Sequence, residues 1–519
     1  MKKNTLKKGL ALGMLLAIMV SSTGCNNSGK EEETAAGGNK ITVWAELNAT
    51  LSTKVTNFGE TPLAKELSKR TGIEVEYVHP PQGQTTEAFN LLIASGKLPD
   101  VIRYNWFEQG AQKMINNKII LDLTEDIEKN APNLKKLLKE HPDWDKQVKT
   151  DSGSYYTFPF FRGDKSLLCY TGPIVRKDWL DELGMEMPET IDDWEKMLTA
   201  FKEKKGADVP LSLLAYYFDH GFISGAFGVY ADFYIDNGKV KYGPMEDGYL
   251  DFLTLLNKWY KAGLLDKNLA SVDSKLLDTY MLNDRMGATV GLVGGNLGKW
   301  TGSMKAKNDK VNLVAATYPV LNKGDEPEMS RCDWDSNPVS GYAISAKTKN
   351  RDLAVKFLDY GYGEEGSMLL NFGIEGDTYE MVDGQPKFTQ KMTDILNGNT
   401  QESTHFYSMG VYSGPLVQDK RLIEQTLVHD VQKDAYNIWS VPKAFEHKLP
   451  PVQYNDEESE IRTAIITDLT TYKEEMVMAF ITGSRPLSEF DAFREQLKKI
   501  GVEEVLKVEN SAYKRYQNR

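Results

Sequence analysis

The chain is poor in the residues from which reactive centres and metal sites are usually built. Its 519 residues include three cysteines and six histidines. Neither CxxC nor HxxxH spacing occurs, so the sequence contains no zinc or thiol-redox motif. A GxSxG nucleophile elbow is also absent, and the carboxylates are too numerous for a glycosidase pair to be chosen. We therefore expect a protein that is not an enzyme and that uses no cofactor and no metal.

Long apolar runs are also scarce. The run at the N-terminus, Leu10 to Val20, is shorter than the roughly 20 residues that cross a bilayer. It follows four lysines and precedes small residues that end at Cys25, which is the pattern of a signal peptide. Small residues before a cysteine resemble the lipobox of bacterial lipoproteins, in which the cysteine thiol is diacylated. Ser22 stands where that motif usually has an aliphatic residue, and an ordinary signal peptide with an incidental cysteine is the alternative.

The residues after Cys25 are polar and glycine-rich and show no apolar period. Such a composition predicts a flexible tether. We therefore expect a signal peptide at residues 1–24, a tether at residues 25–40, and a lipid on Cys25 that holds the mature chain on the extracytoplasmic face of the cell membrane. No later segment is long and apolar enough to be a transmembrane helix.

Positive charge is in deficit. The chain has 62 Lys and Arg against 74 Asp and Glu, a net charge of -12, which disfavours nucleic-acid binding. Its length predicts two or three domains, and we expect a monomer. Cys169 and Cys332 could form a disulfide in an oxidising compartment, or they could be buried free thiols.

Strand and helix patterns alternate from residue 41 onward. They predict strands at Ile41 to Ala45 and Ile73 to Val78, a third strand after Asp100, and helices at Leu63 to Arg70 and Glu87 to Ser95. Such alternation within about 60 residues is typical of a parallel sheet with crossover helices. An α/β lobe therefore begins near residue 41.

The stretch from Ile174 to Lys202 predicts two helices separated by a turn. The first runs from about Lys177 to Leu183 and ends at Gly184. The second begins with a capping box of Thr190 and Asp193, and the apolar period of its residues predicts one buried face that includes Trp194. Acidic residues on this second helix would repel phosphate, so a DNA-binding helix-turn-helix is excluded.

The C-terminal part shows mainly helical periods. Ile461 to Phe480 keeps one apolar face over 20 residues, and Ser488 with Asp491 predicts a second capping box. Two hairpin turns are predicted at Asn237-Gly238 and at Asp383-Gly384.

Two segments have sequence patterns that predict strands connecting one lobe to another. Pro159 fixes an extended backbone within the aromatic run SYYTFPFF, and Val311 to Tyr318 forms a second candidate strand before Pro319. Between them, Gly294-Gly295-Asn296 lacks the GK[ST] ending of a phosphate loop. We expect its backbone to approach another group closely.

Several blocks resemble one family, the large lipoprotein solute-binding proteins of bacterial ATP-binding-cassette importers, also called extracellular solute-binding family 1. The blocks follow one another in the order expected for the family. They are NLLIASGKLPDVI (Asn90 to Ile102), VRKDWLDELGMEMPETIDDW (Val175 to Trp194), GIEGDTYEMVDGQPKFT (Gly373 to Thr389), and FITGSRPLSEFDAF with VENSAYKRY (within Phe480 to Tyr516).

The resemblance implies a two-lobe α/β fold of the type II periplasmic-binding-protein class, with an interlobe cleft and a helical C-terminal part. It places lobe 1 at residues 41–158 and about 319–390, and lobe 2 at residues 159–318 and about 391–519. It further implies that the cleft captures a small solute, commonly an oligosaccharide, for the permease subunits of an importer. Some members carry a calcium loop after the second helix described above. The matching segment here, KKGADVPLS, has Asp208 as its only carboxylate, so we expect no metal there.

Sugar recognition needs flat apolar faces and planar hydrogen-bonding groups, and open α/β sheets place ligands at strand ends and glycine-rich loops. The aromatic candidates at such positions are Trp44, Trp106, Tyr156, Trp300, Trp334 and Trp439. The polar candidates beside them are Glu46, Asn105, Arg176 and Asp335. A role in the core is the alternative for each aromatic residue, and a surface or capping role for each polar one.

The sequence alone leaves two other functions open. A surface-anchored glycan-processing enzyme would share the lipid anchor, and so would a peptide-binding or sensor lipoprotein that does not feed transport. Sustained release of reducing ends would favour the enzyme, whereas stoichiometric binding without turnover would favour the receptor.

Overall fold

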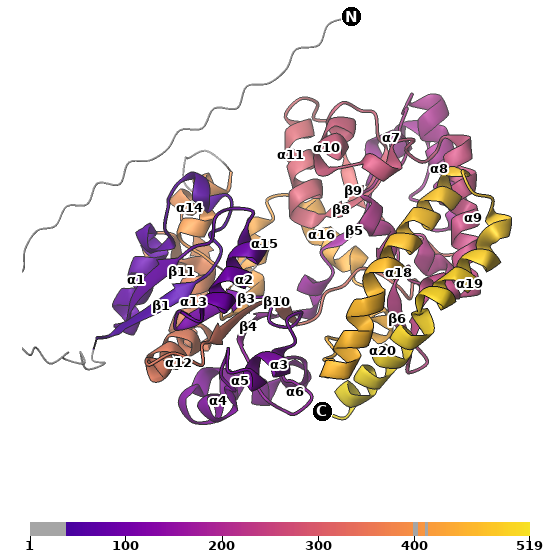
Figure 1. Cartoon of the computed structure of the whole chain (residues 1–519). Helices are drawn as coiled ribbons and strands as arrows, with labels where there is room; N and C mark the ends of the chain where they lie inside the picture. Colours follow the sequence, from indigo (N-terminus) through magenta and orange to yellow (C-terminus); the bar gives the residue numbers. More distant parts are fainter. Residues whose placement is uncertain (1–37, 398–402, 410–413) are drawn as a thin grey trace, which may run out of the picture. The chain divides into compact units, whose positions relative to one another are not determined.

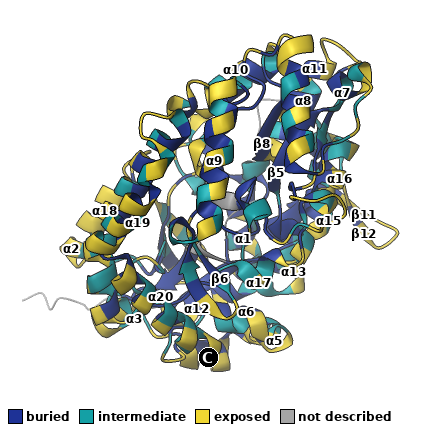
Figure 2. Ribbon diagram, turned by 90° about the vertical axis from the view of Figure 1, so that its right-hand side faces the viewer, coloured by how far each residue is buried: buried dark blue, intermediate teal, exposed yellow. Residues whose placement is uncertain are grey.

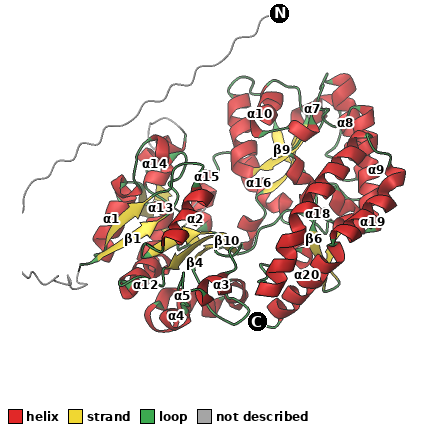
Figure 3. Cartoon of the chain, viewed as in Figure 1, coloured by secondary structure: helices red, strands yellow, loops and turns green. Residues whose placement is uncertain are grey.

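The computed structural model describes residues 38–397, 403–409 and 414–519 (Figure 1). The predicted signal peptide, Cys25 and nearly all of the predicted tether lie outside these residues. Within the described part, no helix combines the length and apolar character needed to cross a bilayer. Helices predominate over strands in this part, and the strands gather into sheets (Figure 3).

A six-stranded sheet organises the N-terminal half of the fold. β1 (Lys40–Trp44) pairs in parallel with both β2 (Glu74–Val78) and β3 (Val101–Tyr104), which confirms the parallel sheet predicted from the sequence. β10 (Ser336–Ile344) runs antiparallel between β3 and β4 (Phe158–Arg162), and β13 (Val417–Gln418) adds a short parallel edge.

The helices of this part bury their apolar faces against the sheet and against one another. α1 (Pro62–Thr71) and α2 (Thr85–Ser95) connect the parallel strands, and each ends at a glycine in the left-handed conformation, Gly72 and Gly96. The others are α3 (Ala111–Asn116), α4 (Thr124–Asn130), α5 (Pro132–Glu140), α6 (Pro142–Gln147), α12 (Arg351–Asp359), α13 (Glu364–Phe372) and α14 (Gln390–Leu396). α15 (Lys420–Thr426) instead buries Leu422 and Ile423 in the core of the second part.

A three-stranded antiparallel sheet organises the second part, in the order β8 (Ala288–Leu292), β5 (Thr171–Arg176) and β9 (Leu313–Ala315). Figure 2 shows β5 and β8 as buried, while α8 and α9 turn exposed faces outward. The helices of this part are α7 (Lys177–Leu183), α8 (Ile191–Lys204), α9 (Asp247–Ala262), α10 (Ser274–Leu282), α11 (Lys299–Lys305), α16 (Asp430–Trp439) and α17 (Ala444–His447).

Within the residues that the structure describes, the chain passes between the two sheets three times. The passages are residues 163–170 between β4 and β5, residues 316–335 between β9 and β10, and residues 419–429 between β13 and α16, which packs on β5 and β9. The predicted divisions at residues 158/159 and 390/391 do not follow this pairing, because β4 and β13 are both hydrogen-bonded into the six-stranded sheet. Strand pairing is a long-range property that the local pattern around Pro159 does not contain.

Three helices close the chain: α18 (Asp456–Thr482), α19 (Phe490–Ile500) and α20 (Val502–Gln517), which confirms the helical C-terminal part. α20 is tied to the turn before β4. Asp151 accepts hydrogen bonds from the guanidinium groups of Arg515, at 2.6 Å, and of Arg519, at 2.9 Å. The end of the chain therefore contacts the first half of the fold.

The predicted helix pair at residues 174–202 is confirmed in its details. α7 ends at Gly184 in the left-handed conformation, and Thr190 and Asp193 form the capping box at the start of α8. The second predicted box is wrong. α19 begins at Phe490 after a short 3-10 turn, Leu487–Glu489, so Ser488 precedes the helix without capping it.

Replacing Thr190 by alanine is expected to lower the free energy of unfolding by about 1 kcal/mol, because the Asp193 N–H at the start of α8 loses the Thr190 hydroxyl that accepts its hydrogen bond. Urea unfolding followed by tryptophan fluorescence measures the change. Ser488→Ala is the matched control, since Ser488 is exposed and caps no helix. Equal losses in both variants would contradict the capping assignment.

Both predicted hairpins are present, as β6 (Phe233–Asp236) with β7 (Lys239–Tyr242) and as β11 (Tyr379–Val382) with β12 (Gln385–Phe388). The predicted glycine loop is instead a π-helical turn, Val293–Gly298. A Cβ on Gly294 would meet nothing within 4 Å, whereas one on Gly298 would lie 2.2 Å from Nε2 of Gln432. The close approach is therefore to α16 and occurs at Gly298.

Candidate functional site

Six aromatic and charged residues meet where the chain passes between the two sheets. We name this group the crossing cluster: Arg162, Tyr170, Arg331, Asp333, Trp334 and Lys448. Arg162 ends β4, Tyr170 directly precedes β5, Arg331 to Trp334 precede β10, and Lys448 follows α17. The elements of both sheets thus bring these side chains together.

Asp333 is the centre of the cluster. Its carboxylate accepts a hydrogen bond from the Tyr170 hydroxyl at 2.7 Å, and the guanidinium groups of Arg162 and Arg331 lie 3.4 and 3.6 Å away. Burial opposes ionisation of Asp333, but the charge of Lys448 and these neighbours outweigh burial, so the pKa of Asp333 lies below its usual value. Asp333 is therefore an ionised carboxylate that orients two cations and a phenol.

The Tyr170 ring completes this arrangement. The Arg162 guanidinium lies 4.6 Å from the centre of the ring, which is a cation–π distance. Burial and the nearby Asp333 carboxylate raise the pKa of Tyr170 to about 12, so its hydroxyl remains a hydrogen-bond donor. The buried Arg162 also donates to the Gln418 side chain at 3.2 Å.

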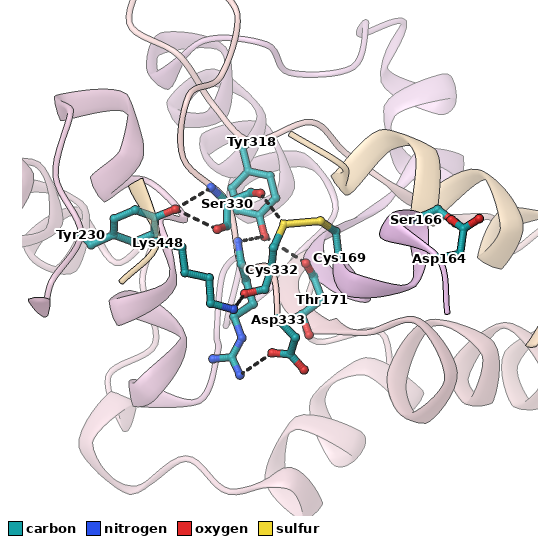
Figure 4. The surroundings of a disulfide bond; sticks show 11 residues. Asp164, Ser166, Cys169, Thr171, Tyr230, Tyr318, Ser330, Cys332, Asp333 and Lys448 are labelled. Atoms are coloured by element: carbon teal, nitrogen blue, oxygen red, sulfur yellow. Dashed lines mark hydrogen bonds and ion pairs between the residues drawn. A yellow bond between two sulfur atoms is a disulfide. The ribbon is translucent and has the colours of Figure 1, made fainter. Parts of the chain in front are cut away.

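A disulfide joins Cys169 to Cys332, which decides between the two alternatives left by the sequence (Figure 4). It links the first passage between the sheets to the second. Backbone contacts hold the same segments: Asp333 N–H donates to the Leu168 carbonyl at 2.8 Å, and Tyr318 accepts from Arg331 N–H at 3.1 Å while donating to the Thr171 carbonyl. The loop that carries Arg331 and Asp333 is therefore fixed from both sides.

Lys448 enters the cluster from the opposite side of that loop. Its ammonium group donates to the Cys332 carbonyl and lies 5.4 Å from the centre of the Trp334 ring, whose Nε1–H donates to the Leu449 carbonyl at 2.8 Å. Burial lowers the pKa of Lys448 to about 7, although Asp333 acts in the opposite direction. The charge of Lys448 thus changes near neutral pH.

Lys448→Met is expected to remove part of the pH dependence of stability. Between about pH 7 and the ordinary lysine pKa of 10.5, the unfolded chain binds a proton at Lys448 that the folded protein does not. Stability of the native protein should therefore rise with pH across this range, and the rise should be shallower in the variant. Thermal unfolding at pH 7, 8 and 9 measures both slopes, with the exposed Lys499→Met as control. Identical slopes in all three proteins would contradict the assignment.

A cavity of about 290 Å³ adjoins the cluster and is lined by Tyr230, Tyr234, Arg331, Asp333 and Lys448 among others. The buried Tyr217 lies near Arg331 and Tyr170, and the ring of Tyr216, a residue that is 51% exposed, lies 4.4 Å from the Tyr217 ring. Aromatic faces together with oriented charged donors and acceptors suit the binding of a polyhydroxylated ligand.

Among the described residues, no group of three or more His, Cys, Asp or Glu side chains could hold a metal ion. Asp208 lies in the segment that corresponds to the calcium loop of some family members. Both of its carboxylate oxygens accept from the Nε–H group of Arg285, at 3.0 and 3.1 Å. Its carboxylate is thus engaged by a side-chain cation.

Of the ten predicted ligand-binding residues, Trp334 and Asp335 lie in or beside the crossing cluster. Asp335 is buried: its carboxylate accepts from the Gln147 side chain at 3.3 Å, and its carbonyl accepts from Arg162 N–H at 2.7 Å. Burial raises the pKa of Asp335, against the effect of the Gln147 hydrogen bond.

The five other predicted aromatic residues are buried in apolar cores. Trp44, Trp106 and Tyr156 belong to one core cluster with Phe89, whereas Trp300 and Trp439 belong to the core of the second part. Trp300 donates to Asp278 at 2.8 Å, and Trp439 donates to the Pro173 carbonyl at 3.2 Å. Their rings pack against protein on all sides, and contact of these five with a ligand stays a prediction.

The three remaining polar candidates lie apart from the cluster. Arg176 is buried, pairs with Asp178 and Asp284, and stacks 4.3 Å from the centre of the Trp179 ring. Asn105 accepts from Glu108 N–H at 3.3 Å within a turn. Glu46 lines a separate cavity of about 390 Å³ beside the six-stranded sheet. Ligand contact by these residues also stays a prediction.

Sequence reasoning missed Arg162, Tyr170, Tyr216, Arg331, Asp333 and Lys448. A signal was present for three of them. Arg162 ends the strand that was predicted to leave the first lobe, Asp333 lies in the same CDWDSNP segment as Trp334, and Tyr216 lies in an aromatic, glycine-rich stretch. Nothing in the local sequence indicates Tyr170, Arg331 or Lys448.

The chain is built on two sheets, and its aromatic and charged site lies where the chain passes between them. This is the architecture of a periplasmic-type solute-binding protein. The family model of bacterial extracellular solute-binding proteins matches residues 56–368, more than half of the chain. The chain belongs to this family, which confirms the resemblance inferred from the sequence blocks, and the two-lobe α/β fold predicted from it is confirmed as well.

Two curated relatives match most of the chain. The fructooligosaccharide ABC transporter substrate-binding protein FusA of Streptococcus pneumoniae serotype 4 is 25% identical over 487 residues, which cover 88% of this chain and 87% of FusA. Lipoprotein LipO of Bacillus subtilis (strain 168) is 25% identical over 540 residues, with 99% of each chain covered. Among solved structures, an extracellular solute-binding protein of Bifidobacterium longum subsp. infantis has a TM-score of 0.73 at 21% identity, covering 93% of this chain and 99% of that one.

Proposed function

We propose that this protein is the lipid-anchored receptor of an ABC importer and that it captures an oligosaccharide outside the cytoplasm. The crossing cluster is the observation that carries the proposal. Asp333 orients Arg162, Tyr170 and Arg331 beside a cavity and an exposed tyrosine, which is the set of groups that sugar hydroxyls and ring faces require. The names of FusA and LipO support the solute class and the anchor.

The two sheets are the centres of the two proposed lobes. Strand pairing favours residues 40–162 and 336–418 for lobe 1, and residues 171–315 and 430–519 for lobe 2. The crossing cluster would then lie on the segments that join the lobes. Ligand contacts from both lobes would favour a closed state, because only that state makes all of them.

The remaining parts of the proposal concern the membrane and the importer. Diacylation at Cys25 would hold the receptor beside permease subunits that recognise its closed state, and the protein would act as a monomer. It would bind its solute without chemical change. The second alternative, a peptide-binding or sensor lipoprotein, would share the anchor but bind no sugar.

Uptake of labelled oligosaccharides by intact cells tests this function. A deletion strain should lose uptake of at least one oligosaccharide, and a plasmid copy should restore it. A Cys25→Ser copy should restore uptake poorly, because the receptor no longer stays at the membrane. Unchanged uptake of every tested oligosaccharide in the deletion strain would contradict the proposal, and sustained release of reducing ends by the purified protein would favour an enzyme.

A further inference from the structure

A second pocket, of about 580 Å³, is lined by residues from both proposed lobes and from two of the passages between the sheets. Its walls come from the 3-10 turn Lys165–Leu168, from β12, and from α15 and α16. The lining is strongly positive. Lys387, Lys420, Arg421 and Lys433 face a single acidic residue, Glu424, although the whole chain has a net charge of -12. By contrast, the cavity of the crossing cluster has two cations, Arg331 and Lys448, and two carboxylates, Asp232 and Asp333.

The acidic partners of these cations determine which of them can bind a ligand. Arg421 makes a two-pronged contact with Asp419, at 3.0 and 3.1 Å from its Nε, and is therefore a fixed part of the wall. Lys420 lies 3.6 Å from Asp164, and Lys433 lies 3.5 Å from Asp430, with all four side chains more than a third exposed. Exposed pairs at such distances contribute little to stability. An entering anion can replace them at low cost.

Neutral polar groups complete the pocket. Gln385, Gln425, Tyr436 and Asn437 line it beside the cations. The Gln425 side chain is fixed by hydrogen bonds with Phe388 N–H at 2.8 Å and with the Pro386 carbonyl at 3.0 Å. Amides and an aromatic ring are groups that recognise sugar hydroxyls and ring faces, so the lining suits a sugar that also carries negative charge.

We propose that this pocket is a subsite for a uronate unit, so that the captured oligosaccharide carries carboxylates. The inference rests on the proposed oligosaccharide receptor and adds the charge of its solute. Ammonium–carboxylate hydrogen bonds are stronger than neutral ones, and they weaken with ionic strength where they are partly exposed. The pocket would therefore select acidic over neutral sugars of the same shape.

Isothermal titration with matched sugars tests the proposal. The probes are trisaccharides of galacturonate, mannuronate and glucuronate, the methyl ester of each, and neutral fructo- and xylo-trisaccharides. A sulfated neutral trisaccharide is added, because sulfate offers the same charge with a different geometry. We expect at least one uronate to bind about tenfold or more tightly than its ester, and the difference to shrink at high salt.

Two double variants test whether the preference for the acid over its ester depends on this pocket. The double variant Lys387→Gln/Lys433→Gln should lose most of the preference for the acid over its ester, because both side chains are exposed and their loss should not disturb folding. Lys499→Gln/Lys507→Gln removes the same charge from exposed positions on α19 and α20 and should retain the preference.

Four outcomes would each overturn the proposed uronate subsite. They are equal affinity for acid and ester, binding of neutral sugars only, tighter binding of the sulfated sugar than of every uronate, and an unchanged preference for the acid in the pocket variant. Each of these four outcomes would leave the oligosaccharide receptor standing. Absence of binding to every sugar would instead overturn the proposed function itself.

Discussion

Replacement of Cys169 and Cys332 by alanine is expected to lower the free energy of unfolding by about 2–5 kcal/mol, the usual cost of losing a native disulfide. The two cysteines are 163 residues apart, so the bond removes a large amount of conformational freedom from the unfolded chain. Differential scanning calorimetry of the mature protein measures the loss as a lower melting temperature.

The disulfide variant should also bind its solute more weakly, because Cys332 lies between Arg331 and Asp333 in the loop that the bond fixes. Dithiothreitol provides the control: it should lower the melting temperature of the native protein towards that of the variant and leave the variant unchanged. An unchanged melting temperature of the native protein after complete reduction, shown by thiol titration, would contradict a structural role for the bond.

Asp333→Asn is expected to reduce affinity for the captured oligosaccharide by about tenfold to hundredfold, since losing a hydrogen bond to a charged group costs about 1.5–3 kcal/mol. The substitution preserves the size of the side chain but removes the charge that orients Arg162, Tyr170 and Arg331. Titration calorimetry at constant pH measures the loss.

Asp309→Asn is the matched control for this variant, because Asp309 is exposed and lies outside the crossing cluster. Circular dichroism should show both variants folded at the temperature of titration. Native affinity in a folded Asp333→Asn protein would mean that the crossing cluster is structural and that the solute binds elsewhere.

The features of the fold that the sequence predicted depend on a few neighbouring residues. The capping box of Thr190, the terminal Gly184 and the Asn237-Gly238 hairpin each need only local chemistry, and all three are present. The failure at Ser488 has a local cause as well. A 3-10 turn ends at Glu489, so α19 starts later than the serine and acid spacing indicates.

The strand order of the six-stranded sheet could not be predicted from the sequence, because its strand partners are distant in the chain. β4 pairs with β10 and β13, and nothing near Pro159 distinguishes a strand that leaves the first sheet from one that is still part of it. The three-stranded sheet likewise unites segments that start at Thr171, Ala288 and Leu313.

The candidate site was predicted only in part, for two physical reasons. A tryptophan after a strand can serve a ligand or a core, and packing with Phe89 placed Trp44 and Trp106 in a core. The charged members of the crossing cluster meet across long stretches of chain: Arg162 and Asp333 are 171 residues apart, and Lys448 lies 116 residues from the Cys332 carbonyl that it contacts. No local sequence pattern indicates such long-range contacts, whereas Trp334 could be predicted because it lies beside a strand.

Titration calorimetry of the mature protein against oligosaccharides, peptides and amino acids tests whether the protein is an oligosaccharide receptor. We expect saturable binding of at least one oligosaccharide at one site per chain, without turnover, and no heat from peptides or amino acids. Saturable peptide binding with no response to any sugar would contradict the proposed function.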